Sequence, residues 1–181
     1  MASVCVYLGA RAGEGSQWAD AAKQAGRSIA ERGHTLVYGG GRLGLMGILA
    51  DAALASGGRV VGVIPESMVE REQAHPDIHE NHIVEGMHAR KLKLTEFADA
   101  FLVLPGGFGT MDELFEAITW RQLDLHHKKI GLWSVSDYYA DLWSFLANGR
   151  QLGFMPSSTF DAIHIGTDLE PLLDGILVTG S

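Results

Sequence analysis

Five short apolar segments are spaced along the chain, and they constrain its fold more than any other feature. A strand covered by helices on both faces has a continuous apolar pattern, whereas a strand with one solvent face alternates polar and apolar residues. The five segments are continuous in this way, and two weaker candidates accompany them. The strong segments occupy residues 4–8, 35–38, 59–64, 100–104 and 129–133, and the weaker ones residues 82–84 and 162–165.

Helix-like patterns separate these segments. We expect helices over residues 17–32, 45–56, 87–98, 111–125, 137–148 and 169–177. The alternation of strands and helices predicts an α/β fold with a Rossmann-like, doubly wound, mostly parallel sheet and helices on both faces. A chain of 181 residues has the usual length of one domain, so we expect residues 1–181 to form a single domain.

The charge balance limits the ligands of this chain. It has 14 Lys and Arg against 22 Asp and Glu, a net charge of −8, which excludes the diffuse basic field of a nucleic-acid-binding protein. No apolar run approaches the roughly 20 residues of a membrane span, and the N-terminus has no targeting pattern. We therefore expect a cytoplasmic protein without nucleic-acid or membrane partners. The single cysteine, Cys5, permits no intrachain disulfide.

Glycine is the unusual component of the composition. The chain has 23 glycines, where average usage of about 7% gives roughly 13 in this length. Many of them follow predicted strands, at Gly9, Gly39, Gly40, Gly41 and Gly44, and again at Gly106, Gly107 and Gly109. Ligands of doubly wound sheets bind at the carboxyl ends of the strands, so these glycines predict a binding site there.

The spacing Gly39-x-Gly41-x-x-Gly44 matches a dinucleotide-binding pattern, and Glu66 stands about where a ribose-binding carboxylate is expected. An NAD(P)-dependent oxidoreductase is therefore one hypothesis. The same glycines also suit a tight strand-to-helix turn, and the pattern alone is weak evidence.

A stronger pattern follows the fourth strong segment, as Pro105-Gly106-Gly107-Phe108-Gly109-Thr110. Glycines allow successive backbone N–H groups to face one point, and a helix N-terminus adds partial positive charge. No Gly-Lys-Ser/Thr follows, so the loop is not a triphosphate-binding P-loop. We predict a monophosphate site, with the Thr110 hydroxyl as a further donor.

Acidic residues follow this loop. The spacing Thr110-x-x-Glu113 is that of a capping box, in which Glu113 has a structural role only. The same placement also puts a carboxylate beside a sugar phosphate, where it suits stabilisation of an oxocarbenium ion or orientation of a water. Glu116 is expected on the same helix face as Glu113, with Asp112 pointing elsewhere.

Candidate cations precede the fourth strong segment. Arg90 and Lys91 suit a nucleotide phosphate or a leaving base, although they also fit an ordinary solvated helix face. The histidines at positions 75, 79 and 82 fall in what looks like a loop and not on a helix, so we expect no metal site.

Four motifs in this order resemble the LONELY GUY (LOG) family of cytokinin riboside 5'-monophosphate phosphoribohydrolases, some of which were labelled possible lysine decarboxylases. The motifs are Tyr38-Gly39-Gly40-Gly41, Gly44-Leu45-Met46-Gly47, Met87-His88-Ala89-Arg90-Lys91 and Pro105-Gly106-Gly107-Phe108-Gly109-Thr110-Met111-Asp112-Glu113. The resemblance implies a nucleotide-binding domain that hydrolyses the N-glycosidic bond of an adenosine 5'-monophosphate, N6-substituted or not, without a cofactor. Nucleotide salvage and a non-catalytic nucleotide-cofactor carrier remain alternatives.

The resemblance also implies site residues and assembly. Arg90 and Glu113 match the residues essential for catalysis in the family. Family members are dimers or assemblies of dimers, a contact that Trp120, Leu123 and Leu125 would suit, although core packing explains these side chains equally well. The chain departs from the family after the first strand, where Ala10-Arg11 replaces the usual Ser-Ser. The implied substrate-binding residues are Glu72, Arg90, Lys91, Gly107, Phe108, Gly109, Thr110, Met111, Asp112, Glu113 and Thr119.

Overall fold

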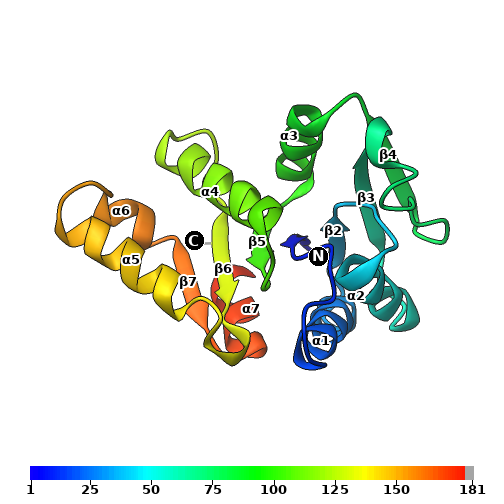
Figure 1. Ribbon diagram of the computed structural model, residues 1–181, viewed down its shortest axis with the longest axis horizontal. Coiled ribbons are helices and arrows are strands. Elements are labelled where there is room, and N and C mark those ends of the chain that lie inside the picture. The colour runs from blue at the N-terminus through cyan, green and yellow to red at the C-terminus, as the bar shows by residue number, and fades with distance from the viewer. Residues whose placement is uncertain (178–181) are drawn as a thin grey trace.

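One continuous sheet organises the computed structural model, which describes residues 1–177 (Figure 1). Within those residues it has seven strands in the order β4-β3-β2-β1-β5-β6-β7, and every neighbouring pair is parallel. All five strong segments and both weaker ones are strands, and the mostly parallel sheet of the prediction is parallel throughout. The strands are β1 (Ser3–Tyr7), β2 (Thr35–Tyr38), β3 (Val60–Pro65), β4 (Glu80–Val84), β5 (Ala100–Val103), β6 (Lys129–Trp133) and β7 (Ile163–Gly166).

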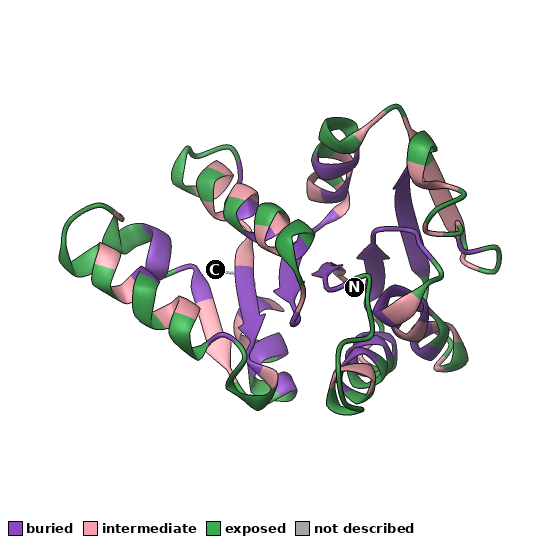
Figure 2. Ribbon diagram, in the orientation of Figure 1, coloured by how far each residue is buried: buried purple, intermediate pink, exposed green. Residues whose placement is uncertain are grey.

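Helices cover both faces of this sheet, as the buried strand pattern predicts. Side chains alternate along β1, so that Val4 and Val6 pack on one face while Cys5 and Tyr7 pack on the other. The first core includes α1, α2 and α7, and the second includes α3, α4 and α5 (Figures 1 and 2). The helices are α1 (Gln17–Glu31), α2 (Gly44–Ala55), α3 (Met87–Phe97), α4 (Phe108–Gln122), α5 (Ala140–Gln151), α6 (Ser157–Phe160) and α7 (Leu169–Leu177).

Two predicted helices, over residues 111–125 and 137–148, are each displaced by three residues at both ends. Helix α4 begins three residues earlier than predicted, because Gly107 is its N-cap and the glycine motif continues into the first turn. Helix α5 begins three residues later, because a 3₁₀ turn at Val135–Asp137 intervenes and Ser136 is left-handed within it. The short helix α6 had no sequence signal that we recognised.

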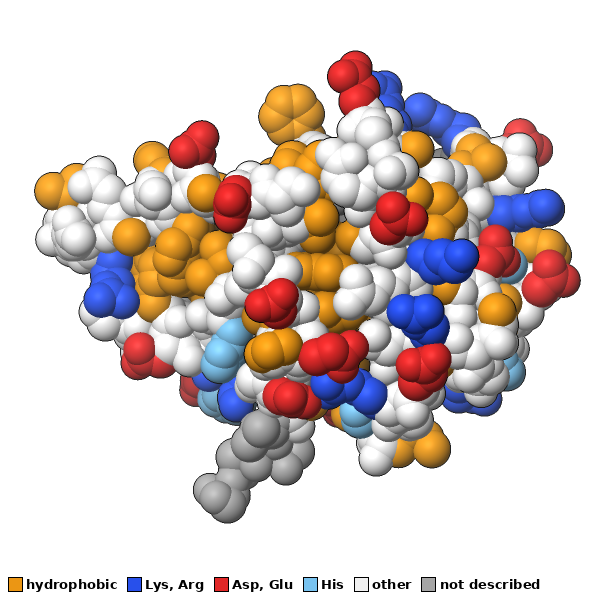
Figure 3. Space-filling view, turned by 90° about the horizontal axis from the view of Figure 1, so that it is seen from below, with side chains coloured by type: hydrophobic (Ala, Val, Ile, Leu, Met, Phe, Trp, Pro, Cys, Tyr) orange, Lys and Arg blue, Asp and Glu red, His pale blue; other side chains and the backbone are white. Residues whose placement is uncertain are grey.

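Three further observations concern membrane spans, surface charge and the extent of the domain. Among residues 1–177, no helix is both long enough and apolar enough to cross a membrane. On the face shown in Figure 3, Lys and Arg side chains are interspersed with Asp and Glu side chains. The single domain predicted over residues 1–181 includes residues 178–181, which lie outside the described residues.

Candidate active site

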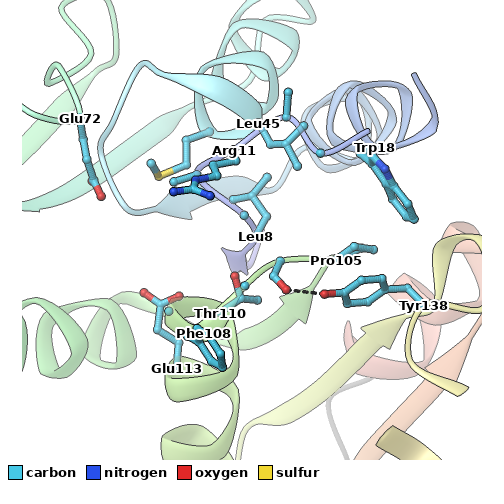
Figure 4. Close-up of a pocket in the computed structure, with 18 of the residues that line it drawn as sticks. Leu8, Arg11, Trp18, Leu45, Glu72, Pro105, Phe108, Thr110, Glu113 and Tyr138 are labelled. Carbon is cyan, nitrogen blue, oxygen red and sulfur yellow. Dashed lines mark hydrogen bonds between the residues drawn. The ribbon is translucent and has the colours of Figure 1, made fainter. Parts of the chain in front are cut away.

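A cavity of about 900 Å³ opens at the carboxyl ends of β1 and β5 (Figure 4). Parallel strands of a doubly wound sheet place ligands at this edge, next to the loops that follow each strand. The walls come from the segment after β1, from the start of α2, from the β5–α4 connection, and from single side chains of other segments. Its lining residues include Leu8, Gly9, Arg11, Trp18, Leu45, Met46, Glu72, Arg90, Gly107, Phe108, Gly109, Thr110, Glu113 and Tyr138.

The N-terminus of α4 forms one wall. The first amides of any α-helix have no helical acceptor, so those of Phe108, Gly109 and Thr110 are free to bind an anion. Gly106 permits the tight turn before them, because a Cβ there would lie 2.0 Å from Thr110 Oγ1 and 2.8 Å from the Gly9 nitrogen. The segment therefore has the backbone geometry of a phosphate site.

The predicted capping box is wrong. Thr110 is the third residue of α4 rather than its N-cap, and no side-chain hydrogen bond caps the helix. Thr110 is buried and packs against Gly106, while Glu113 lies one turn further on and lines the cavity. Glu113 is therefore not used to cap the helix.

Arg90 reaches the cavity from α3 and is 6% exposed. Its Nη2 donates a hydrogen bond to the Gly39 carbonyl oxygen at 3.2 Å and lies 3.7 Å from Glu72 Oε2. Within the described residues, Arg90 Nε and Glu72 Oε2 are buried without a hydrogen-bond partner. Because buried polar atoms nearly always have a hydrogen-bond partner, we expect these two atoms to form hydrogen bonds with polar groups of a ligand.

Glu72 is held in place by its backbone. The Arg42 amide donates to the Glu72 carbonyl oxygen at 3.0 Å, and a bridge joins Gly41 to Ala74. A Cβ on Gly41 would lie 3.2 Å from both the Cβ and the carbonyl oxygen of Glu72. The glycines after β2 therefore bring the segment that carries Glu72 close to the sheet edge.

Glu113 is partly buried at the cavity wall. Burial raises the pKa of Glu113 to about 7, an effect that the Arg90 guanidinium opposes and that the Asp112 and Glu72 carboxylates reinforce. Near neutral pH the protonated and ionised forms are thus both populated. A carboxyl group in this condition can stabilise a developing positive charge or accept a proton from water.

Lys91 points to a different place from Arg90. Its Nζ lies 2.7 Å from Glu116 Oε2 and 3.2 Å from Asp112 Oδ2, and its side chain is 9% exposed. Lys91 therefore brings Asp112 and Glu116 together, contrary to the prediction that Asp112 points elsewhere. Neither Lys91 nor its two partners lines the cavity.

Other predicted residues also lie outside the cavity lining, namely Met111, Thr119, Gly39, Gly40 and Gly41. Gly39 instead faces Arg90, since a Cβ there would lie 2.0 Å from Nη2. The dinucleotide pattern has structural explanations as well: a Cβ on Gly44 would lie 1.9 Å from the Ala10 carbonyl oxygen. Glu66 is exposed in a 3₁₀ turn after β3 and does not line the cavity.

Trp18 and Tyr138 line the cavity but were not predicted from the sequence. Arg11 was noted there only as a departure from the usual family sequence. Trp18 and Tyr138 contact each other edge to face, with ring centroids 5.8 Å apart. Arg11 follows β1 and Tyr138 follows β6, so position after a strand was the available signal. Among the described residues, no group of three or more histidine, cysteine and acidic side chains has the arrangement of a metal site.

The fold and the cavity together define a Rossmann-like α/β protein with an anion site at a helix N-terminus, flanked by an arginine and two carboxylates. The protein-family model described as "Possible lysine decarboxylase" matches residues 46–176 of this chain. The cytokinin riboside 5'-monophosphate phosphoribohydrolase of Rhodococcoides fascians is 45% identical over 96% of this chain and 88% of its own length. The LOG phosphoribohydrolase of Oryza sativa subsp. japonica is 45% identical over 84% of this chain and 63% of its own length.

The chain therefore belongs to the LOG family. Similarity to solved structures agrees at the level of the fold. The Moco carrier protein of Chlamydomonas reinhardtii superposes with a TM-score of 0.68 at 19% identity, covering 92% of this chain and 90% of that one.

Proposed function

We propose that the protein hydrolyses the N-glycosidic bond of an adenosine 5'-monophosphate, N6-substituted or not, giving the free base and ribose 5-phosphate. Acting on an N6-substituted substrate, it would activate a cytokinin. The names of the relatives support this reaction. The observation that carries the proposal is that Arg90, Glu113 and the α4 N-terminus line one cavity.

The α4 N-terminus binds the 5'-phosphate in this proposal. The free amides of Phe108, Gly109 and Thr110 donate to phosphate oxygens, and the helix dipole favours the negative charge. A local site of this kind is needed because the net charge of −8 repels an anion over longer distances.

Glu113 and Arg90 act at the glycosidic bond. As the bond breaks, its electron pair leaves with the base, and the carboxylate of Glu113 stabilises the positive charge on the ribose. Water then adds at the anomeric carbon, with Glu113 orienting it and accepting its proton. The departing base takes up one proton from solvent, and Glu113 returns its proton to solvent, so the step balances. Arg90 fixes the nucleotide and assists departure of the base. The reaction consumes water and moves no electrons between molecules, so no redox cofactor is required.

The remaining family positions support the site from behind. Lys91 joins α3 to α4 through Asp112 and Glu116, and Met111 packs on the second core. Gly39 leaves room for Arg90, and Gly41 leaves room for Glu72. We further propose a single nucleotide-binding domain, a cytoplasmic location, and a homodimer or an assembly of dimers. Leu123 and Leu125, which are 60% and 67% exposed, suit the subunit contact.

Chromatography of reactions with four compounds tests the activity. Adenosine 5'-monophosphate and an N6-isopentenyl derivative should release free base, while the two matching unphosphorylated nucleosides should not. A preference for the unsubstituted nucleotide would favour nucleotide salvage over cytokinin activation. Tight binding of both nucleotides without turnover would contradict the proposed reaction and favour a carrier.

The Glu113→Gln variant tests the mechanism. It retains the size of the side chain and removes the carboxylate, so turnover should fall by at least roughly 10²-fold. Wild-type turnover in this variant would exclude the role given to Glu113.

A further inference from the structure

Tyr138 donates a hydrogen bond from its hydroxyl group to the Gly106 carbonyl oxygen at 2.6 Å (Figure 4). Gly106 directly precedes the N-cap of α4, so this bond acts on the peptide that leads into the anion site. Tyr138 is not part of any of the four LOG motifs. It lies in the segment after β6, and its side chain lines the cavity.

The bond fixes the direction of one peptide. The C=O and N–H groups of a trans peptide point in opposite directions. Because the Gly106 carbonyl points at Tyr138, the Gly107 N–H points away from it, to the side on which Thr110 and Glu113 lie (Figure 4). A reversed peptide would present a carbonyl oxygen to the phosphate, which repels an anion.

The chain takes an uncommon path to place Tyr138. Ser136 and Asp137 have φ values of 51° and 59°, so two consecutive non-glycine residues adopt left-handed backbone immediately before it. Such conformations are costly and persist where the surrounding structure imposes them, often at functional sites. Trp18 packs edge to face on the Tyr138 ring and limits its rotation.

We propose that Tyr138 is a positioning residue for phosphate binding, which holds the Gly106–Gly107 peptide with its N–H toward the ligand. This inference rests on the proposed phosphate site at α4. It assigns Tyr138 no direct step in bond cleavage. Loss of the hydroxyl should therefore weaken binding of the phosphorylated sugar and leave binding of the free base unchanged.

The neighbouring tyrosine provides a matched control. Tyr139 also donates to a backbone carbonyl at 2.6 Å, that of Leu104, but it is buried and does not line the cavity. Tyr138→Phe and Tyr139→Phe thus each remove one hydroxyl group and one hydrogen bond of the same kind. Tyr138 is 46% exposed, so its variant should fold, which a thermal melt checks.

Isothermal titration with ribose 5-phosphate and, separately, with adenine tests the proposal without requiring turnover. We expect Tyr138→Phe to raise the dissociation constant of ribose 5-phosphate about 3- to 10-fold, the usual effect of one hydrogen bond, with adenine binding unchanged. In turnover assays KM should rise by a similar factor while kcat stays within about twofold. Tyr139→Phe should match the wild type in all of these measurements.

Equal affinity of wild type and Tyr138→Phe for ribose 5-phosphate would overturn the proposal, as would an equal loss in Tyr139→Phe. Failure of the wild type to bind ribose 5-phosphate would overturn it too. If the wild type cleaves no nucleotide but Tyr138→Phe selectively weakens ribose 5-phosphate binding, the proposed reaction fails and the positioning role of Tyr138 stands.

Discussion

The Gly39 α-carbon and the Arg90 guanidinium approach each other so closely that a Cβ at position 39 would lie 2.0 Å from Arg90 Nη2. The Gly39 carbonyl oxygen also accepts a hydrogen bond from the same nitrogen. The glycine after β2 therefore determines where the guanidinium lies, although Gly39 does not itself line the cavity.

Replacing Gly39 with alanine should displace Arg90 rather than unfold the protein, because the clashing atom is the far end of a flexible side chain. Misplacement of a catalytic group by about 1 Å costs on the order of 10²-fold in rate, and we expect a loss of that size in kcat/KM. Steady-state kinetics and a thermal melt check this. Gly166→Ala is the control, since its Cβ would meet only one atom, at 3.8 Å. Wild-type kinetics in Gly39→Ala would contradict the assigned role.

The pKa of Glu113 predicts a pH dependence of activity. The proposed mechanism uses the ionised carboxylate, and the pKa of Glu113 is about 7 in the free protein. We therefore expect kcat/KM to rise with pH and to level off above about pH 8. Pre-steady-state and steady-state rate measurements from pH 5 to 9 test this dependence of kcat/KM on pH. Glu96→Gln, on the exposed side of α3, should keep the same profile. A flat profile would remove Glu113 as the group that controls the rate.

The Glu113 carboxyl group also predicts that stability falls with rising pH, whereas activity rises. The folded-state pKa of Glu113 is raised from 4.5 to about 7, so between these values the folded state holds a proton that the unfolded state has lost. Stability then falls as pH rises through this window, by up to about 3 kcal/mol from this residue. Glu113→Gln should be more stable than the wild type at pH 8 and no more stable at pH 5, as measured by urea unfolding. Equal stability of the two proteins at pH 8 would show that the carboxylate is not buried as described.

The order of elements was predictable because buried parallel strands carry a continuous apolar pattern that helices interrupt. The strands Thr35–Tyr38 and Lys129–Trp133 have the predicted bounds. The start of α4 was not predictable in the same way, because Gly107 and Gly109 are poor helix formers that the fold nevertheless places at and after an N-cap. Tertiary contacts decided that boundary.

The site was predictable where one motif supplies it. Glu113 and the amides of α4 come from a single continuous segment, so local spacing indicated them. The direction of Lys91 was not predictable, because Arg90 and Lys91 are adjacent and either could face the cavity. Lys91 on α3 contacts Asp112 and Glu116 on α4, which leaves Arg90 as the residue that faces the cavity. The hydrogen bond from Tyr138 to Gly106 joins residues 32 apart, beyond the reach of spacing arguments.

The ion pairs of Lys91 predict a structural effect on substitution. Lys91→Met keeps the aliphatic packing and leaves the Asp112 and Glu116 carboxylates without their shared cation. We expect a loss of about 1–2 kcal/mol in the free energy of unfolding, since both carboxylates keep contact with solvent. Binding of ribose 5-phosphate should change by less than about twofold, because Lys91 does not line the cavity. Lost binding at unchanged stability would instead make Lys91 a ligand of the phosphate.

The exposed leucines after α4 predict how the protein assembles. Leu123 and Leu125 are 60% and 67% exposed, and burying one leucine contributes roughly 1.5–3 kcal/mol. Leu125→Asp removes this contribution and places a charge in the proposed contact, so the dissociation constant of the proposed dimer should rise by roughly 10²-fold or more. Light scattering across a dilution series measures this. Phe154→Asp changes an equally apolar, 82% exposed residue after α5 and should leave the proposed dimer intact. Dissociation by Phe154→Asp but not by Leu125→Asp would place the subunit contact on the α5 side of the molecule.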